Sequence, residues 1–434
     1  MNQLARHIGF VALVLYGTGD ILGAGVYGLV GKAAGQMGSA AWMAFLISML
    51  AAGLTGLSYA SIGSRYPRAA GTAYVVDKAF RRQFLSYLVG LMALGSGLPS
   101  MATATRVFAG YFSAFLSGVP VWLIGLGFIL GLTFVVFWGV REAIWVNSVC
   151  TLIEMGGLLV VIFVGASFLG SVDYLSAVAP GNPTGELSGA LFLSGAVLTF
   201  YSFIGFEDMI NMAEEVKEPE KNIPRALIGA ILISSCIYIL ISLIAVSVLD
   251  PQTLSESSQP LVDVVAKASP GFPTGVFSLI AAFAVANTAL LNFLMSSRLM
   301  YGMSREGMLP KFLNQIHSKR KTPSRATFVV AGALIVLVLV GDISALARAT
   351  SVLLLSSFMI VNISLFVLQG RKGEPRGRFE VPRAVPLLGF VVCGALLFHS
   401  EKSEVVIAGA IVAVIVALYF ILRRSGQFGQ VQGD

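Results

Sequence analysis

Apolar residues occur along this chain in long runs that are separated by short polar segments. A helix needs about 20 mostly apolar residues to cross the hydrocarbon core of a bilayer. Twelve runs predict membrane-spanning helices, at residues 8–30, 40–63, 84–117, 121–139, 144–168, 189–213, 225–249, 276–302, 325–341, 346–369, 385–399 and 404–423. The eleventh run, at residues 385–399, is short enough to tilt or to lie partly at the interface. The pattern therefore predicts an all-α polytopic membrane protein with about 12 transmembrane helices.

The composition agrees with a surface that faces lipid. Of the 434 residues, 56% are hydrophobic and 12% are charged, whereas soluble domains carry about 25% charged residues. Cys150, Cys236 and Cys393 all fall within apolar runs, so neither a disulfide framework nor a metal cluster is indicated, and no cofactor is expected. We see no cleavable signal peptide and no separate soluble domain, and residues 1–434 are expected to form one transmembrane unit.

The basic residues are distributed unevenly between the two sets of connecting segments. With the amino terminus assigned to the cytoplasm, 24 of the 29 Lys and Arg residues fall in inner segments, four fall in outer segments, and Arg106 lies within a span. Positive residues accumulate on the cytoplasmic side of membrane proteins. The asymmetry predicts a multi-pass protein of the cell membrane with both termini in the cytoplasm. It also accounts for the net charge of +7 without a nucleic-acid partner.

Two of the predicted spans contain glycines that an uninterrupted helix would not favour. Span one reads GTGDILGAGVYG at residues 17–28, and each glycine costs a helix up to about 1 kcal/mol relative to Ala. Span six reads FYSFIGFED at residues 200–208, with Gly205 in its middle. Interrupted helices are tolerated in lipid only where the freed backbone lines a cavity or is buried in protein. Alternatively, Gly23 and Gly25 only permit close packing of helices.

The two interrupted spans lie at corresponding positions, five spans apart along the chain. This spacing is typical of transporters that are built from two repeats of inverted topology and bind their substrate between broken helices. The first five-helix repeat is expected at residues 8–168 and the second at residues 189–369, with two additional helices at residues 385–423.

Four sequence segments carry a family resemblance. They are LGAGVY at 22–27, YPRAAGTAYVVDKAF at 66–80, FYSFIGFED followed by AEEVKEPEKNIPRAL at 213–227, and SRLMYGMSREGMLPKF at 297–312 followed by KTPSRA at 321–326. With these motifs in order over residues 8–370, the chain resembles the amino acid–polyamine–organocation (APC) superfamily. The resemblance implies the LeuT-like five-plus-five inverted-repeat fold, in which helices 1 and 6 are broken, and transport by alternating access.

An amino acid is a zwitterion, so both of its charges must be met inside the membrane. The N–H groups freed around residues 23–25 suit the carboxylate, because they lie at the positive end of a helix dipole. Carbonyls freed around residues 202–204 suit the ammonium. Tyr201, Phe203 and Phe206 either close over the ligand or only pack against their surroundings. The predicted substrate-binding residues are Leu22, Gly23, Ala24, Gly25, Ser202, Phe203, Ile204, Gly205 and Phe206.

Charged residues within the spans are further candidates, because an ionised group at the bilayer centre costs about 2.5–3.5 kcal/mol. Glu154 of span five shares a helical face with Asn147 and Thr151. Many proton-coupled relatives carry a lysine at this position, so the acid leaves the coupling mechanism open. Three roles stay open for Glu154. It carries a proton, it is a structural residue that accepts a hydrogen bond or pairs with Arg106, or it binds a cation.

Asp20 precedes the break in span one, where relatives usually have an uncharged residue. Three roles stay open for Asp20. It selects substrates with an extra positive charge, it carries a second proton, or it pairs with Arg106. Alternatively, Arg106 extends outward from span three. Glu207 follows the span-six glycine, as an acid often does in this family, and is a ligand contact or a structural group. Thr288 and Asn292 share a face of span eight that lines the site or joins helices.

The sequence thus predicts a secondary transporter of amino acids, a symporter or antiporter, with no enzymatic role and no catalytic or metal-binding residues. Neutral amino acids are the first expectation, because Asp20 and Glu207 are the only evident acids near the site. Cationic amino acids or polyamines are the alternative, and protons are the candidate coupling ion. The chain lacks the GxxxxGK[ST] motif of ATP-driven pumps. A non-transporting nutrient sensor is an alternative of a different class.

Overall fold

The apolar runs form helices close to the predicted bounds. The computed structural model describes residues 4, 6–23, 25–113, 116, 118–257, 259–339 and 344–424, so the predicted ends of the third and ninth spans lie partly outside the described residues. The spanning segments are α1 (Phe10–Leu22) with α2 (Gly25–Met37), α3 (Ala41–Arg65), α5 (Gln83–Ser113), α6 (Val121–Trp138), α7 (Val140–Gly165), α8 (Gly189–Phe200) with η3 (Tyr201–Phe203) and η4 (Phe206–Glu215), α9 (Pro219–Val248), α12 (Thr274–Arg305), α13 (Ser324–Leu339), α14 (Ser344–Gly370), α15 (Ala384–Phe398) and α16 (Lys402–Arg424).

Length and composition support a membrane location for these helices. Within the described residues, nine helical stretches are long and apolar enough to cross a membrane, and α1, α13 and α15 are shorter apolar helices. The predicted class, an all-α polytopic membrane protein, is confirmed.

Three short helices occur where the sequence predicts only loops. α4 (Gly71–Phe80) follows α3, while α10 (Pro251–Glu256) and α11 (Pro260–Ala268) lie between α9 and α12. Each is too short for the apolar run that marks a spanning helix. The remaining 3₁₀ segments of the described chain are η1 (Gly38–Ala40), η2 (Ala166–Phe168) and η5 (Lys311–Asn314).

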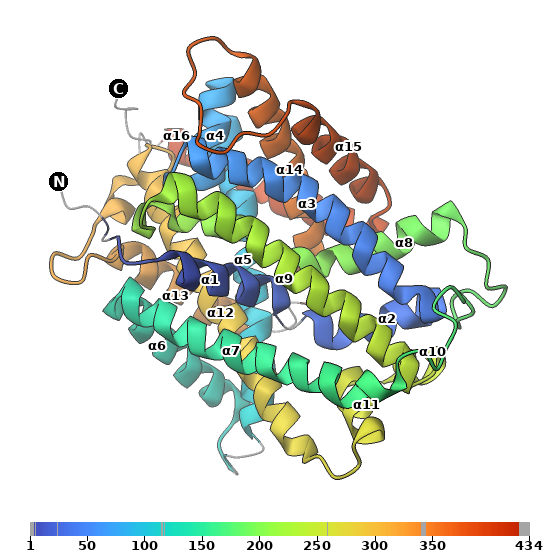
Figure 1. Ribbon diagram of the computed structural model, residues 1–434. Coiled ribbons are helices and arrows are strands. Elements are labelled where there is room, and N and C mark those ends of the chain that lie inside the picture. The colour runs from blue at the N-terminus through green and yellow to red at the C-terminus, as the bar shows by residue number, and fades with distance from the viewer. Residues whose placement is uncertain are drawn as a thin grey trace.

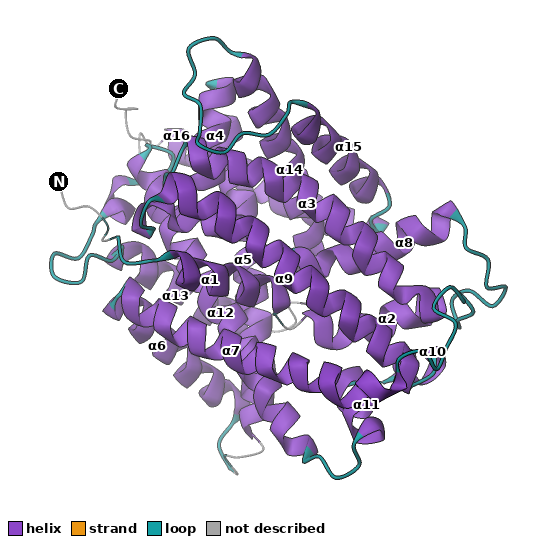
Figure 2. Cartoon of the chain, in the orientation of Figure 1, coloured by secondary structure: helices purple, strands orange, loops and turns teal. Residues whose placement is uncertain are grey.

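Helices that are far apart along the chain pack side by side in the bundle. α3 lies beside α9 (Figure 1), and α5 packs along α12. α1 contacts α7, α9, α12 and η4, and its residues from Tyr16 to Leu22 are buried among other helices. All ordered elements of the described chain are helical, and the loops gather mainly at the two ends of the bundle (Figure 2).

Ion pairs join the segments at one end of the bundle. Arg65 binds Glu380 at 2.6 Å, and Arg305 binds Glu214. The backbone N–H of Ile8 donates to the carbonyl of Glu215 at the end of η4, and the Ile8 carbonyl accepts from the N–H of Lys217. Figure 1 shows α4 near this end and α10 and α11 at the opposite end. The basic segments that were assigned to the cytoplasm therefore lie together, while the orientation of the bundle in the membrane stays a prediction.

Candidate functional site

Span one is interrupted inside the bundle. α1 ends at Leu22, and Gly23 adopts φ 30° and ψ −170°, a conformation that a Cβ would strain. A new helix, α2, begins at Gly25. Ala24, which belongs to the predicted site, lies outside the described residues. The predicted interruption of this span is confirmed.

Span six is interrupted at the predicted place as well. The short segment η3 ends at Phe203, and Ile204 is extended, with φ −65° and ψ 139°. Gly205 has φ 127°, which only glycine adopts readily. The helical path then resumes as η4.

The backbones of the two interruptions touch. A Cβ built on Gly205 would lie 2.8 Å from the carbonyl carbon and oxygen of Asp20, so a side chain there would collide with the end of α1. Gly25 faces Ser202 at a more relaxed distance, because a Cβ on Gly25 would lie 3.7 Å from the Ser202 Cα. Glycine at position 205 is therefore required for this close approach.

Tyr238 of α9 lies between the two interruptions. Its hydroxyl oxygen is 2.5 Å from the carbonyl of Ile21, 3.2 Å from that of Leu22 and 2.9 Å from that of Ser202. A hydroxyl has one hydrogen to donate, so the three carbonyls share it. The side chain thus joins carbonyls that both helix ends leave free, and Leu22 contributes to this junction rather than to a cavity wall.

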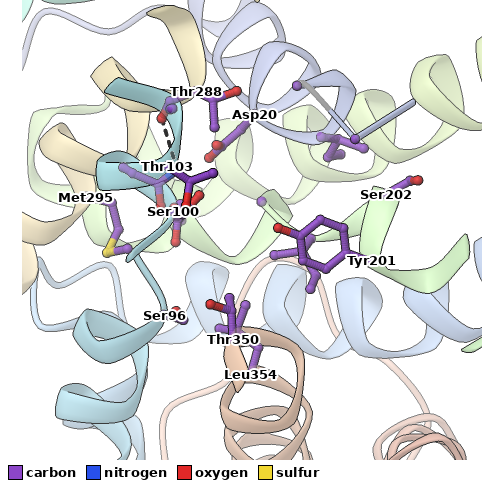
Figure 3. Close-up of a pocket in the computed structure, with 18 of the residues that line it drawn as sticks. Asp20, Ser96, Ser100, Thr103, Tyr201, Ser202, Thr288, Met295, Thr350 and Leu354 are labelled. Atoms are coloured by element: carbon purple, nitrogen blue, oxygen red, sulfur yellow. Dashed lines mark hydrogen bonds between the residues drawn. The ribbon is translucent and has the colours of Figure 1, made fainter. Parts of the chain in front are cut away.

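A cavity of about 230 Å³ opens beside the two interruptions. Predicted site residues line it, namely Gly23, Gly25, Ser202, Ile204 and Gly205, together with the predicted selectivity candidates Asp20, Glu207, Thr288 and Asn292. Figure 3 shows Tyr201 on the opposite side of this cavity from Ser96, Ser100 and Thr103 of α5. The structure therefore brings most of the predicted site together.

Three carboxyl groups face the cavity, and among the lining residues whose side chains the structure describes there is no Lys, Arg or His. They belong to Asp20, Glu207 and Asp208, each of which is 6–7% exposed. Glu207 accepts a hydrogen bond of 2.9 Å from the Gly205 N–H, whereas the Asp20 Oδ2 atom has no hydrogen-bond partner among the described residues. Buried carboxylates ordinarily need a positive partner, and this site leaves that position to a ligand or to protons.

Arg106 is not that partner. Its guanidinium donates a 2.7 Å hydrogen bond to the carbonyl of Val338, and within the described chain it forms no ion pair with Asp20 or Glu154. The interpretation of either acid as a partner of Arg106 is therefore wrong.

Two of the predicted aromatic residues lie behind the cavity wall. Phe203 is fully buried and its ring stands edge-on to Tyr238, with centroids 5.3 Å apart. Phe206 is also fully buried, against Tyr59 and Phe358. Both predictions of a ligand contact need correction, because neither residue lines the cavity and both rings are packed in the core. Tyr201 is the one of the three aromatics that faces the cavity.

Glu154 lies apart from the cavity lining, in a separate polar region. The side chain is completely buried, and neither carboxyl oxygen has a hydrogen-bond partner among the described residues. One turn earlier on the same helix, the Thr151 hydroxyl lies 3.3 Å from the carbonyl of Leu15 and accepts a 3.0 Å hydrogen bond from Asn287. The polar face of α7 that the sequence predicts thus points toward α1 and α12.

Sequence reasoning missed the contribution of α5 and α14 to the cavity. Ser96, Ser100 and Thr103 line it from α5, and Thr350 lines it from α14. The three α5 residues are spaced so that they share one helical face, and Pro99 within this run removes a helical hydrogen bond. Three polar residues on one helical face, together with a proline, are the feature of this apolar span that could have predicted its place in the cavity wall.

Two interrupted helices around a buried polar cavity, inside a bundle of spanning helices, are the hallmarks of a secondary transporter. The chain belongs to the amino acid permease family, whose model matches residues 8–425. It is thus an integral membrane protein of a transporter family, and the family supports amino acid transport.

Individual relatives differ in what they carry. The branched-chain amino acid permease BcaP of Bacillus subtilis (strain 168) is 25% identical, over 98% of this chain and 94% of that protein. The methylthioribose transporter of the same organism is 26% identical, over 98% of this chain and 95% of that protein. Cationic amino acid transporter 9, chloroplastic, of Arabidopsis thaliana is 29% identical, over 73% of this chain and 58% of that protein.

Proposed function

We propose that this chain is a secondary transporter that carries amino acids with a positively charged side chain, by alternating access to the cavity between its two interrupted spans. The substrate carboxylate binds the free N–H groups at the start of α2, near Gly25, and the α-ammonium binds near the interruption of span six. The inverted repeats at residues 8–168 and 189–369 supply the two halves that move around the site.

One observation carries the choice of substrate. Asp20, Glu207 and Asp208 line a cavity whose described lining residues include no basic side chain. The ammonium or guanidinium of a cationic side chain supplies these carboxyls with a counter-charge, which a neutral side chain lacks. The geometry therefore favours the alternative that the sequence left open over its first expectation, neutral amino acids.

Proton coupling through Glu154 is the second part of the proposal. The carboxyl is buried and has no hydrogen-bond partner among the described residues, which favours its neutral form in a low-dielectric medium. It lies on the α7 face whose Thr151 contacts α1. Movement of α1 during alternating access would change the hydration of this face, so Glu154 binds a proton on one side of the membrane and releases it on the other.

Calorimetric titration of the purified full-length protein with lysine, arginine and leucine tests the substrate class. We expect lysine and arginine to bind at least about tenfold more tightly than leucine, since one charge-assisted contact contributes about 1.5–3 kcal/mol. Asp20→Asn should lower that preference by about tenfold, and Asp263→Asn on the exposed face of α11 should leave it unchanged. Tighter binding of leucine would contradict the substrate class, and no binding of any amino acid would contradict the function.

A further inference from the structure

A second cavity, of about 540 Å³, lies where α7 begins, beside the segment that leads into α1. None of its lining residues belongs to the cavity between the interrupted spans. Ile8, which is hydrogen-bonded to the end of span six, is one of them, so this cavity lies at the end of the bundle that carries the basic segments. Its apolar lining residues include Ile8, Ala12, Val140 and Ile144, and its charged ones are Arg141 and Glu142.

The outer side of this cavity belongs to a face of α7 that meets lipid. Trp145 lines the cavity and is 68% exposed, and Leu152 and Leu159 follow it at intervals of seven residues, 56% and 52% exposed. Seven residues are about two helical turns, so the three side chains form one stripe. Arg141 is exposed as well and precedes Trp145 by four residues, which places it at the start of the same stripe. The cavity therefore opens toward the bilayer near its interface.

The two polar groups on this stripe are ordered by depth. Arg141 is the second residue of α7, and Trp145 lies about 6 Å further along the helix axis. Neither the Arg141 guanidinium nor the Trp145 indole N–H has a partner among the residues that the structure describes. Tryptophan is enriched where bilayer and water meet, since its ring is apolar and its N–H is a donor. A charged donor is thus followed by a neutral donor and then by apolar side chains, as in a phospholipid read from its phosphate to its acyl chains.

Glu142 adds a negative charge at the mouth of the cavity. A Cβ on Gly139 would collide with the Glu142 carboxylate, so this carboxylate lies over the first turn of α7, where the helix dipole favours a negative charge. Glu142 is exposed and has no ion-pair partner within the described part of the chain. Because Arg141 and Glu142 are consecutive residues that line one cavity, its mouth presents one cation and one anion side by side.

From this arrangement we infer that the cavity binds a phospholipid with a primary ammonium headgroup, phosphatidylethanolamine. The phosphate binds Arg141, whose planar fork matches phosphate oxygens, and the ammonium binds Glu142. The Trp145 indole donates to an ester carbonyl of the lipid. One acyl chain fills the apolar part of the cavity, so the lipid bridges the start of α1 and the start of α7. A headgroup without an amine would leave the Glu142 carboxylate beside a phosphate and without a counter-charge.

Native mass spectrometry of the full-length protein tests this site. It counts the lipid molecules that the protein retains from micelles with phosphatidylethanolamine, phosphatidylcholine or phosphatidylglycerol at equal concentrations. Arg141→Gln removes the phosphate contact, and Glu142→Gln removes the ammonium contact. Arg325→Gln is the matched control, because Arg325 is likewise exposed, is the second residue of α13, and does not line the cavity.

We expect wild-type protein to bind one phosphatidylethanolamine at least about fivefold more tightly than either other lipid. Affinity for it should fall about tenfold in Arg141→Gln and stay within about twofold in Arg325→Gln. Glu142→Gln should abolish the preference over phosphatidylcholine, whose methylated ammonium has no hydrogen to donate.

Phosphatidylethanolamine should also raise the melting temperature of the wild-type protein more than the other two lipids do, a readout that needs no variant. Equal affinity of the wild-type protein for the three lipids, tighter binding of phosphatidylglycerol, or equal losses in Arg141→Gln and Arg325→Gln would overturn the proposal.

Discussion

Gly25 and Gly205 meet different requirements at the two interruptions. A Cβ on Gly25 would have only ordinary contacts, the nearest at 3.7 Å from the Ser202 Cα, whereas a Cβ on Gly205 would come within 2.8 Å of the Asp20 backbone at a φ of +127°. Gly205 is thus needed for the contact between the two spans. Gly25 lines the cavity, so its missing side chain leaves room for the ligand.

Substitution of Gly25 separates these two roles. Gly25→Leu should abolish substrate binding, because its side chain would fill the gap beside Ser202 where the carboxylate must meet the backbone, while Gly25→Ala should keep binding within a few-fold of wild type. Binding is measured by titration, and membrane insertion is followed as the yield of folded protein. Wild-type affinity in Gly25→Leu would exclude the proposed pose.

Exchange of Glu154 for glutamine tests the coupling proposal. Glu154→Gln resembles a permanently protonated residue, so exchange of substrate for substrate should persist, whereas accumulation driven by an imposed pH gradient should vanish. Asp20→Asn is measured in parallel, because Asp20 is the other candidate carrier. Full gradient-driven accumulation in Glu154→Gln would make Glu154 a structural residue.

For single residues, the sequence predicts which side chains are chemically important better than it predicts where those side chains point. The glycines and Asp20 were recognisable because they are costly in an apolar helix. Phe203 and Phe206 are predicted to contact the ligand, yet both rings are buried in the core, on either side of the extended residue Ile204 and of Gly205 with its positive φ. The sequence pattern indicates which residues share one face of a continuous helix. It does not indicate which way the side chains point where the helix is interrupted.

Among the elements, η4 and α12 are joined by a buried ion pair. Glu215 accepts hydrogen bonds of 3.0 and 3.2 Å from Arg298, and both side chains are fully buried. The adjacent pair of Glu214 and Arg305 is partly exposed. These contacts hold the second half of span six against span eight, at the end of the bundle that carries the basic segments.

Removal of the buried charge should destabilise this connection strongly. Glu215→Gln leaves Arg298 buried without a counter-charge and should lower the free energy of unfolding by about 3–5 kcal/mol. Glu214→Gln, which affects the more exposed pair, should cost about 1 kcal/mol or less. Denaturant unfolding in detergent micelles measures both variants. An equal loss of unfolding free energy in the two variants would contradict a larger contribution of the buried Arg298 pair.

For the whole molecule, the hydrocarbon core sets the length of each span, which is why the spanning helices were predictable from apolar runs alone. The same criterion cannot detect α4, α10 or α11, whose 10, 6 and 9 residues are too few to leave such a run. The division into repeats and the sidedness of the bundle depend on counts and charges, and they stay predictions.

Cysteine labelling tests the sidedness. In a background that lacks the three native cysteines, Lys267→Cys near the end of α11 should react with an impermeant maleimide added outside intact cells, and Lys319→Cys between α12 and α13 should not. Permeabilised cells provide the control, because both positions are exposed and should then react. The reverse pattern would contradict the orientation that the charge asymmetry predicts.

Uptake into liposomes tests the central claim most directly. Purified protein is reconstituted, and entry of radiolabelled lysine is followed with an inward proton gradient, in competition with an excess of unlabelled arginine or leucine. The account predicts saturable uptake that arginine suppresses, that leucine suppresses weakly, and that Gly25→Leu abolishes. Lysine entry no faster than in protein-free liposomes, or uptake that leucine suppresses as strongly as arginine does, would contradict it.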